Sequence, residues 1–367
     1  MSNSGPRVPE FVITGIDSEK DKLSVKKIVV DSVHDGPDMF ELTFVNKSDS
    51  DGNAHDFTDS AGKNNAKLKK FGDPIEIKLG FVEGGQETVV KGEVTGLETI
   101  YRSDGPSELI VRGYDKLHRM TRGRKQRTFL NKKDSDIAKL VAKDSGLSLN
   151  ATDSKIVHDH VFQNNLSDLK FLYSRARAIG FEVALEDDKL VFAPPRVTKS
   201  AVGTLALDGE IQSARLRIST TQQVKEVQVR GWDPIKKKEI LGKSKSGEEY
   251  SKMGGSKAGS AIVNSQYKVG GSAIETVVNV PIKDQSHANS IAKGRLNSLA
   301  LNLIQGEVLT LGNNKLVAGK IVTLELCDTF SGDYYITRAL HTIDASSSNL
   351  GGYYTKLTVK SAGTKAK

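Results

Sequence analysis

The stretch from residue 72 to residue 115 decides the fold of this chain, and it contains three segments: GDPIEIKLG at 72–80, VVKGEVTGLETI at 89–100 and ELIVRGYD at 108–115. Apolar residues alternate with polar ones in each segment. The side chains of a strand point alternately to its two faces, so this spacing predicts half-buried strands. Gly84-Gly85 and other turn residues between the segments predict that the strands form an antiparallel meander.

A similar block returns near the C-terminus, as GKIVTL at 319–324, YITRALHTI at 335–343 and YTKLTV at 354–359. The middle segment of each block contains Leu-x-Thr-Ile, at 97–100 and at 340–343. A second echo pairs VRGYD at 111–115 with VRGWD at 229–233. These matches predict one β-module that is built twice. The two echoes cannot both mark the same strand, because the last strand of the first block is matched once to each.

The length and composition of the chain predict two or three domains without a membrane span. Its 367 residues are 37% hydrophobic and 27% charged, as in an ordinary globular protein. No apolar run reaches the roughly 18 residues of a transmembrane helix, and the polar N-terminus lacks the apolar segment of a signal peptide. The single cysteine, Cys327, excludes a disulfide within the chain, and we expect it to be a small buried residue of a strand. These features predict synthesis and folding in the cytoplasm.

The net charge of the chain is +8, and part of the excess is local. Between His118 and Lys133 no acidic residue occurs, and the basic residues are Arg119, Arg122, Arg124, Lys125, Arg127, Lys132 and Lys133. Such a run can meet an acidic protein partner, a membrane surface or nucleic acid. No aromatic residues interleave with the arginines, and no zinc finger or other DNA-reading motif is present. We therefore expect no specific nucleic-acid partner.

Changes in composition and in the spacing of apolar residues divide the chain into four parts. Residues 1–115 predict a first tube-like β-barrel, and residues 199–235 with 275–367 predict a second, split barrel that carries a helix. Residues 116–198 predict a small α+β domain. The Lys-, Ser- and Gly-rich part 236–274 predicts an insertion or flexible arm. The expected fold class is α+β and mainly β: two tube-like antiparallel β-barrel domains, a small α+β domain and an insertion in the second barrel.

Helix start and stop signals predict two helices in the small domain. Asp134-Ser135-Asp136 can begin the first, and Gly146 ends it. Asn165 or Ser167 can cap the second, and Gly180 ends it. A third helix is expected at 284–303, where apolar residues recur at helical spacing: Ala288, Ile291, Ala292, Leu296, Leu299 and Leu303.

No catalytic, cofactor-binding or metal-binding constellation can be defended in the sequence. His158-Asp159-His160 places two histidines at i and i+2, but no third ligand is recognisable nearby, so an exposed strand end is the expectation. There is no G-x-S-x-G elbow and no P-loop. These absences favour a structural protein over an enzyme.

Several segments occur in an order shared with a known family: GYDKLHR at 113–119, FLNKKDSDIAKL at 129–140, NLSDLKFL at 165–172, RGWDP at 230–234, and the closing helix and strands at 292–303 and 319–343. In this order the chain resembles the baseplate hub proteins of contractile tails. These are the phage late control D family and the related N-terminal hub region of VgrG spike proteins. The resemblance covers nearly the whole chain from about residue 10.

This resemblance implies a structural hub that is not an enzyme and binds no cofactor. It implies a homotrimer in which each chain contributes two barrels, so that six similar positions surround one axis and adapt a sixfold tube to a threefold spike. The expected partners are the inner tail tube protein, the central spike protein and other baseplate proteins. VgrG proteins continue into a spike, whereas this sequence stops at Lys367, so the spike is expected to be a separate chain. The hub would be made in the bacterial cytoplasm and assembled into the baseplate of a virion or a phage-tail-like particle.

Five residues are candidates for partner contacts. Tyr114 and Trp232 occupy matching places in the VRGYD and VRGWD echo. Core packing is the first expectation for both, and an inter-subunit contact is the alternative, because aromatic residues are enriched at interfaces. Arg122, Arg124 and Arg127 are expected to meet acidic faces of tube or baseplate proteins, and their joint substitution is expected to impair assembly without unfolding the chain.

Two functions of other classes stay open. One is a cell-wall glycan-binding module built on residues 116–198, since short β-α-α-β units also occur in peptidoglycan-binding repeats. The other is a tail-associated hydrolase with an unrecognised pair of acidic residues.

Overall fold

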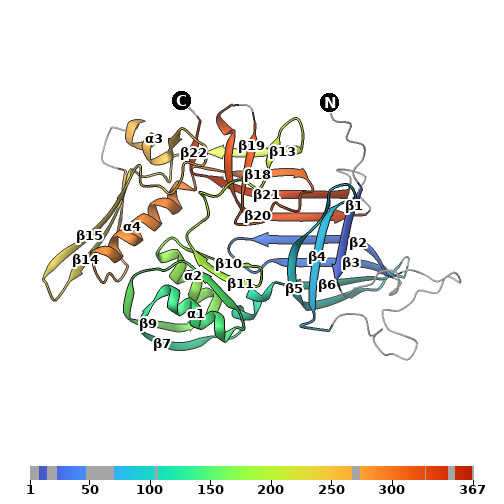
Figure 1. The fold of residues 1–367 in the computed structure, drawn as a ribbon, viewed down its shortest axis with the longest axis horizontal. Coiled ribbons are helices and arrows are strands. Elements are labelled where there is room, and N and C mark those ends of the chain that lie inside the picture. Colours follow the sequence, from blue (N-terminus) through green and yellow to red (C-terminus); the bar gives the residue numbers. More distant parts are fainter. Residues whose placement is uncertain are drawn as a thin grey trace.

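The computed structural model describes residues 8–14, 23–46, 70–103, 106–266, 273–326, 328–345 and 352–365. In these residues the chain is mainly β, and most strand pairs are antiparallel (Figure 1). This confirms the expected α+β, mainly β class. Cys327 lies outside the described residues. No helix in the described ranges has the length and apolar character that a bilayer span requires.

The N-terminal part forms a six-stranded sheet in the order β1-β4-β5-β6-β3-β2. Its strands are β1 Pro9–Thr14, β2 Leu23–Val33, β3 Met39–Asn46, β4 Pro74–Phe81, β5 Gly85–Ile100 and β6 Glu108–Tyr114. The predicted meander is confirmed, because β4, β5 and β6 pair antiparallel in sequence order. Alternate residues of these strands, such as Ile75, Ile77 and Leu79, enter a buried core with Phe40, Leu42 and Phe44.

The C-terminal block builds a second sheet with the same strand order, β12-β19-β20-β21-β18-β13. Its strands are β12 Thr204–Ala206, β13 Ile211–Ile218, β18 Ile304–Leu311, β19 Ile321–Glu325, β20 Gly332–Asp344 and β21 Tyr353–Ser361, with a short 3-10 turn at Asp328–Phe330. The returning block of the sequence forms β19, β20 and β21, as predicted. The two sheets differ at one edge, since β12 runs parallel to β19 whereas β1 runs antiparallel to β4.

The two sheets also share irregularities of register. The pairing of β2 with β3 skips Lys26, and the pairing of β13 with β18 skips Gln212. The pairing of β5 with β6 skips Thr95, and the pairing of β20 with β21 skips Thr337. A β-bulge inserts one unpaired residue at a defined place and is a specific feature of a fold. One strand order and two coincident bulges therefore show that a six-stranded module is present twice, as the sequence predicts.

The bulges also correct the sequence alignment of the two modules. Matching Thr95 to Thr337 places Leu97 at the position of Ala339, so the Leu-x-Thr-Ile match is one residue out of register. The second echo is wrong as a sign of duplication, because the strand that contains Trp232 belongs to neither module. That strand, β14 Glu226–Asp233, lies in a separate side sheet with β15 Lys238–Lys245 and β17 Ile274–Val277.

A seam joins the two modules into one twelve-stranded sheet. Along the seam β2 pairs antiparallel with β20, from Lys27 opposite Asp344 to Val33 opposite Arg338. The seam forms because β20 is long: one stretch of its outer edge pairs with β19, and the stretch beyond the bulge pairs with β2. Figure 1 shows the blue strands β2 and β3 lying alongside the red strands β20 and β21.

A middle module at Lys116–Ala193 packs below the seam (Figure 1). Its elements are the 3-10 helix Lys116–Thr121, β7 Lys125–Lys133, α1 Asp134–Asp144, β8 Ser148–Ala151, β9 Val157–Leu166, α2 Asp168–Ala178, β10 Glu182–Glu186 and β11 Lys189–Ala193. Both predicted helices are confirmed. Ser167 caps α2 by accepting from Lys170 N, and Gly146 and Gly180 follow the helices with positive φ, which glycine adopts without strain.

The side sheet packs on the long helix α4 Gln285–Ala300, which confirms the helix predicted at 284–303. The sequence predicted an insertion or a flexible arm at 236–274, and of these two the flexible arm does not describe β15, because β15 pairs with β14 along its whole length. Gly242 of β15 lies so close to α4 that a Cβ there would be 2.3 Å from the Ala288 carbonyl carbon. The rest of this part contains β16 Lys257–Ala258, paired with β22 Gly363–Thr364, and α3 Gly259–Gln266.

Candidate functional site

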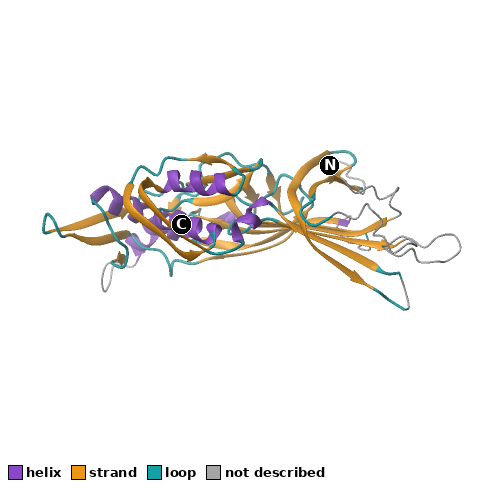
Figure 2. Ribbon diagram, turned by 90° about the horizontal axis from the view of Figure 1, so that it is seen from below, coloured by secondary structure: helices purple, strands orange, loops and turns teal. Residues whose placement is uncertain are grey.

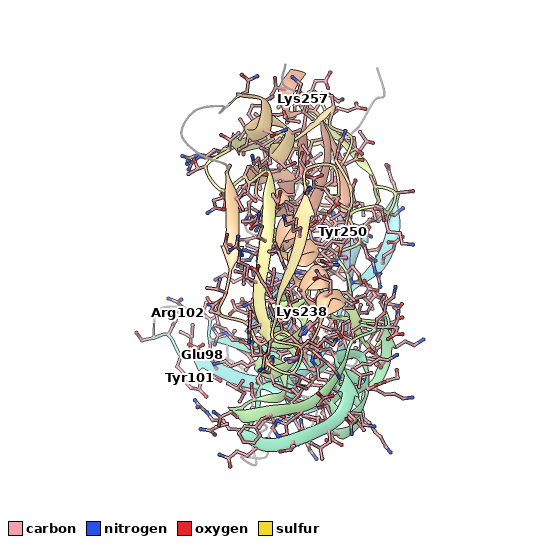
Figure 3. The ribbon with its side chains drawn as sticks, turned by 90° about the vertical axis from the view of Figure 1, so that its left-hand side faces the viewer. Glu98, Tyr101, Arg102, Lys238, Tyr250 and Lys257 are labelled. Atoms are coloured by element: carbon pink, nitrogen blue, oxygen red, sulfur yellow. The ribbon has the colours of Figure 1, made fainter. Side chains whose placement is uncertain are left out.

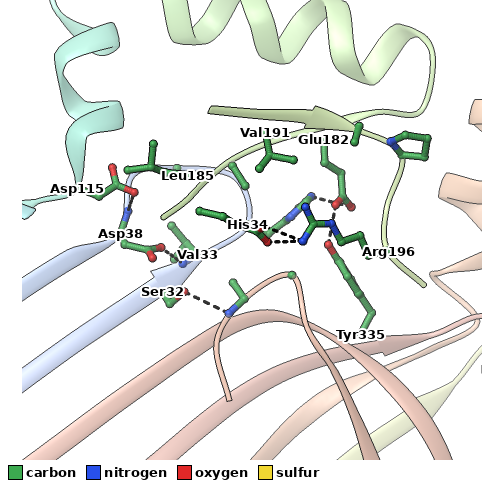
Figure 4. Close-up of a pocket in the computed structure, with 17 residues that line it drawn as sticks. Ser32, Val33, His34, Asp38, Asp115, Glu182, Leu185, Val191, Arg196 and Tyr335 are labelled. Carbon is green, nitrogen blue, oxygen red and sulfur yellow. Dashed lines mark hydrogen bonds and ion pairs between the residues drawn. The ribbon is translucent and has the colours of Figure 1, made fainter. Parts of the chain in front are cut away.

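A small cavity of about 50 Å³ lies where the seam meets the middle module (Figure 4). It is lined by the turn after β2 with His34, by β10 with Glu182, and by β20 with Tyr335. Two more acidic residues, Asp38 and Asp115, line its other end. Pockets that hold small ligands usually measure about 300–1,000 Å³, so this cavity is too small for a sugar ring.

Glu182 ties the middle module to both sheet modules. Its Oε2 accepts a hydrogen bond from the Tyr335 hydroxyl at 2.6 Å, and its Oε1 lies 3.2 Å from His34 Nε2. Burial raises the pKa of Glu182 to about 8 and lowers the pKa of His34. Both shifts favour an uncharged pair at neutral pH, in which the protonated carboxyl of Glu182 donates to His34. The group is thus a structural joint between three elements.

Asp38 and Asp115 use their oxygens to hold backbone amides. Asp38 Oδ1 accepts from Val33 N at 2.8 Å, and Asp115 accepts from Leu117 N at 2.8 Å and from Asp38 N at 3.1 Å. Burial raises the pKa of Asp38 to about 6 and that of Asp115 to about 8. A glycosidase needs two carboxyl groups directed at a substrate. In this structure these carboxyl groups instead cap a turn and a helix.

The raised pKa values of these three carboxyl groups predict that their contribution to stability falls as pH rises. The pKa of Glu182 goes from 4.5 unfolded to about 8 folded, so its contribution to the unfolding free energy is complete below pH 4.5 and is lost as pH rises through 8. Asp115 and Asp38 act with the same sign. Glu182→Gln keeps an acceptor for Tyr335 and removes the ionisation. We expect this variant to be more stable than the parent at pH 9, on the order of 2–4 kcal/mol, with a flatter pH dependence.

Chemical unfolding of the full chain from pH 5 to pH 9 measures this effect. Glu325→Gln, at an exposed residue at the end of β19, is the matched control and should leave the slope unchanged. Equal slopes for Glu182→Gln and the parent would show that Glu182 does not titrate in this range.

The three arginines selected from the sequence do not form one free patch. Arg127 is held inside the middle module, where it donates to Asp168 at 2.5 Å, to Asp144 at 2.6 Å and to Gln163 at 2.9 Å. Its substitution would disturb the fold, so the expectation that all three can be changed without unfolding needs correction at this residue. Arg122 and Arg124 are exposed, and they remain the two residues with which a basic contact to a partner can be tested.

Core packing was the wrong expectation for both aromatic candidates. Tyr114 ends β6 with 39% of its surface exposed, and Trp232 on β14 is 60% exposed. The structure does not bring the two residues together, since they lie in different sheets. Trp232 belongs to the β14–β15 hairpin, whose turn adds Ile235 at 91% exposed, followed by three lysines. Figures 1 and 2 show this hairpin projecting from the end of the molecule remote from β5, which makes its apolar tip a candidate contact surface.

His158 and His160 do not form a pair of metal ligands. His158 is buried, with its Nε2 3.0 Å from Asp134 Oδ2 and 2.9 Å from Arg175, whereas His160 is exposed. In the described residues no group of three or more His, Cys, Asp and Glu side chains is placed to hold a metal ion.

Sequence reasoning missed two strand edges that lack a neighbour in the described structure. One is the outer edge of β13, which pairs on one side only, with β18. The other is the far end of β5, because β4 covers the outer edge of β5 only from Gly85 to Glu93. An open strand edge presents unpaired backbone N–H and C=O groups that can pair with another chain.

Comparison with known proteins gives a family and a set of structural neighbours. The sequence model of the family described as Alg8 N-terminal domain matches residues 10–345. The prophage MuSo2 43 kDa tail protein from Shewanella oneidensis has a similar structure, with a TM-score of 0.65 and 15% identity over 96% of this chain and 98% of that chain. The tail protein from Neisseria meningitidis MC58 has a TM-score of 0.63 and 13% identity over 96% of both chains.

A third neighbour comes from a secretion system. The Escherichia coli c3393 protein is a type VI secretion component with structural similarity to the T4 tail proteins gp27 and gp5, and it matches with a TM-score of 0.59 and 12% identity over 96% of this chain and 76% of that chain. A search of curated proteins finds no significant match. At these identities the likeness establishes the fold, which this chain shares with the two tail proteins and the type VI secretion component.

Proposed function

This chain belongs to the Alg8 N-terminal domain family, and we propose that it is a structural hub in the baseplate of a contractile tail or contractile injection system. In this proposal three copies form a ring that presents six similar modules around one axis. The ring adapts a sixfold inner tube on one side to a threefold central spike on the other. The mechanism is geometric, and no catalytic step or cofactor is part of it.

The observation that carries this proposal is the duplicated six-stranded module. Each chain contains two sheets of the same strand order with the same two bulges. Three such chains supply six nearly equivalent sheets, and closed rotational symmetry then gives a ring with threefold symmetry for the spike and near-sixfold symmetry for the tube. A chain with one copy of the module could not offer both symmetries in a trimer.

The neighbours and the surface agree with this role. Proteins of the same fold are described as phage tail proteins and as a component of a type VI secretion system. We propose the inner tail tube protein, the central spike protein and other baseplate proteins as partners, with late control D and VgrG hub proteins as the related group. Arg122, Arg124, Tyr114 and Trp232 are exposed and available for such contacts.

The division of the chain follows from the same proposal. Residues 1–115 would hold the first ring-forming unit. The parts 199–235 and 275–367 would hold the second, together with the side-sheet strands β14 and β17 and helix α4, which lie outside the six-stranded module. Residues 116–198 would lie outside both as a separate unit. The chain would be made in the bacterial cytoplasm and become part of a virion or a tail-like particle.

The mass of the full chain in solution tests the proposal. Light scattering is expected to give three times the mass of one chain at the highest soluble concentration, alone or with the spike protein. A chain that stays monomeric under both conditions would contradict the hub. Binding to purified cell-wall sacculi that disappears on deletion of residues 116–198 would support the glycan-binding alternative instead.

A further inference from the structure

We infer that the β2–β20 seam inside the chain is repeated between chains. In the proposed joint, the open end of β5 in one copy pairs antiparallel with the outer edge of β13 in the next copy. The register is the one that β20 and β2 adopt within the chain. This inference rests on the proposed self-assembly and specifies which strands and residues join the copies. Its source is the correspondence between the two modules, in which β5 matches β20 and β13 matches β2.

The edge of β13 is open in the described structure. The matching strand β2 has β3 on one side and β20 on the other, whereas β13 has only β18. Ile28 and Val30 of β2 are 0% exposed. Their counterparts Ala214 and Leu216 are exposed and half-buried, respectively. The second module therefore presents the edge that the first module covers with β20.

The far end of β5 is open as well. Beyond the bulge, the outer edge of β20 at Arg338–Asp344 is covered by β2. The corresponding residues are 96–100 at the end of β5 and the two residues that follow the strand, and they have no neighbouring strand on this side in the described part. Leu97 is 40% exposed and Tyr101 is 71% exposed, whereas their counterparts Ala339 and Ile343 are 0% and 5% exposed. Figure 3 shows Glu98, Tyr101 and Arg102 extending from the side of the molecule.

The bulges fix the register of the proposed joint. In the seam Asp31 of β2 lies opposite Leu340 of β20. When the two modules are aligned on their bulges, Asp31 of β2 matches Arg217 of β13, and Leu340 of β20 matches Glu98 of β5. The joint therefore places the arginine of one copy directly opposite the glutamate of the next. The same register places Ala214 opposite Tyr101. Within its own chain Glu98 already accepts from Arg112 Nη1, so Arg217 of the next copy would bring a second cation to this carboxylate. Opposite charges directly across an antiparallel pair stabilise it, and a slip by one residue would turn the side chains to the other face.

The proposed contact is head-to-tail, because it joins two different edges. A contact of this kind either closes into a ring or continues as a filament. The chain already contains one such step, from the first module to the second across the seam. If the joint between chains has the same strand geometry as the seam, it rotates the next module about the axis by the same amount. The copies are then expected to close into the ring of the proposed hub, with neither edge left open.

Cysteine cross-linking of the full chain tests the register directly. The background is Cys327→Ser, since Cys327 is the single cysteine. Glu98→Cys with Arg217→Cys is expected to form a disulfide between chains, because directly opposite residues bring their Cβ atoms within disulfide range. Arg215→Cys with Glu98→Cys is the matched control, two residues out of register on the same face, and should cross-link about tenfold less. Asp31→Cys with Leu340→Cys, at the matching seam positions, should cross-link within one chain.

Three outcomes are distinguishable when the mass is measured on the same samples. A closed oligomer with a disulfide between chains at 98 and 217, and little at 98 and 215, supports the inference. A closed oligomer in which the 98–217 pair reacts no better than the control overturns the inference and leaves the hub proposal standing. A chain that is monomeric at its highest soluble concentration, alone and with the spike protein, overturns both.

Discussion

Replacing Asp168 with alanine is expected to destabilise the middle module by about 2–3 kcal/mol, because the change removes a buried carboxylate that accepts hydrogen bonds from three side chains of the module. Asp168 is 3% exposed at the start of α2. Its carboxylate accepts from Arg127 at 2.5 Å, from Lys125 at 2.6 Å and from Gln163 at 3.0 Å. Hydrogen exchange of the α2 amides in the full chain measures the loss in the module itself.

Asp144→Ala is the matched control for this prediction. Asp144 also accepts from Arg127, at 2.6 Å, but its side chain is 51% exposed. An exposed ion pair is worth about 0–1 kcal/mol, so this variant should change the exchange rates little. Similar increases in the α2 exchange rates for the two variants would show that the burial of Asp168 does not determine the loss of stability.

A charge placed in the seam should unfold the chain, whereas the same charge at the matching edge should only block assembly. Ile28 is 0% exposed on β2, opposite Ile343. Ile28→Asp buries an unpaired carboxylate and is expected to cost about 3 kcal/mol or more of unfolding free energy. Ala214, its counterpart on β13, is exposed, so Ala214→Asp should change the unfolding free energy by about 0.5 kcal/mol or less.

The contrast between the two variants lies in association. In the proposed joint Ala214 faces Tyr101 of the next copy, and Ala214→Asp would bury a charge there. Chemical unfolding together with mass measurement is expected to show a folded monomer for Ala214→Asp and a destabilised chain for Ile28→Asp. A fully assembled Ala214→Asp variant would argue against the joint, and a stable Ile28→Asp variant would argue against the importance of the seam.

Local patterns in the sequence predicted much of the fold. The alternation at 72–115 identified β4, β5 and β6. Asn165 or Ser167 as the cap, with Gly180 as the stop, marked the limits of α2, and the structure selects Ser167. These signals depend on neighbours along the chain, which the sequence displays. The duplication was also correct, since whole strands and their order recur.

Longer-range features could not be read from the sequence. The VRGYD and VRGWD echo joined strands of different sheets, because strand composition does not reveal a strand's neighbours. Trp232 was expected in the core, yet its strand β14 presents it to solvent. Arg127 looked free among basic neighbours, but its partners Asp144 and Asp168 come from later elements of the module. The open edges of β5 and β13 depend on which strands pair, and only the structure shows this.

Cryo-electron microscopy of the protein assembled with its neighbouring tail components tests the central claim most directly. The account predicts a ring of three chains in which six six-stranded modules surround one axis. Around this ring, β2–β20 seams within chains should alternate with β13–β5 joints between chains. Particles that contain single chains, or rings in which the two modules of a chain are not related by rotation about the ring axis, would contradict it.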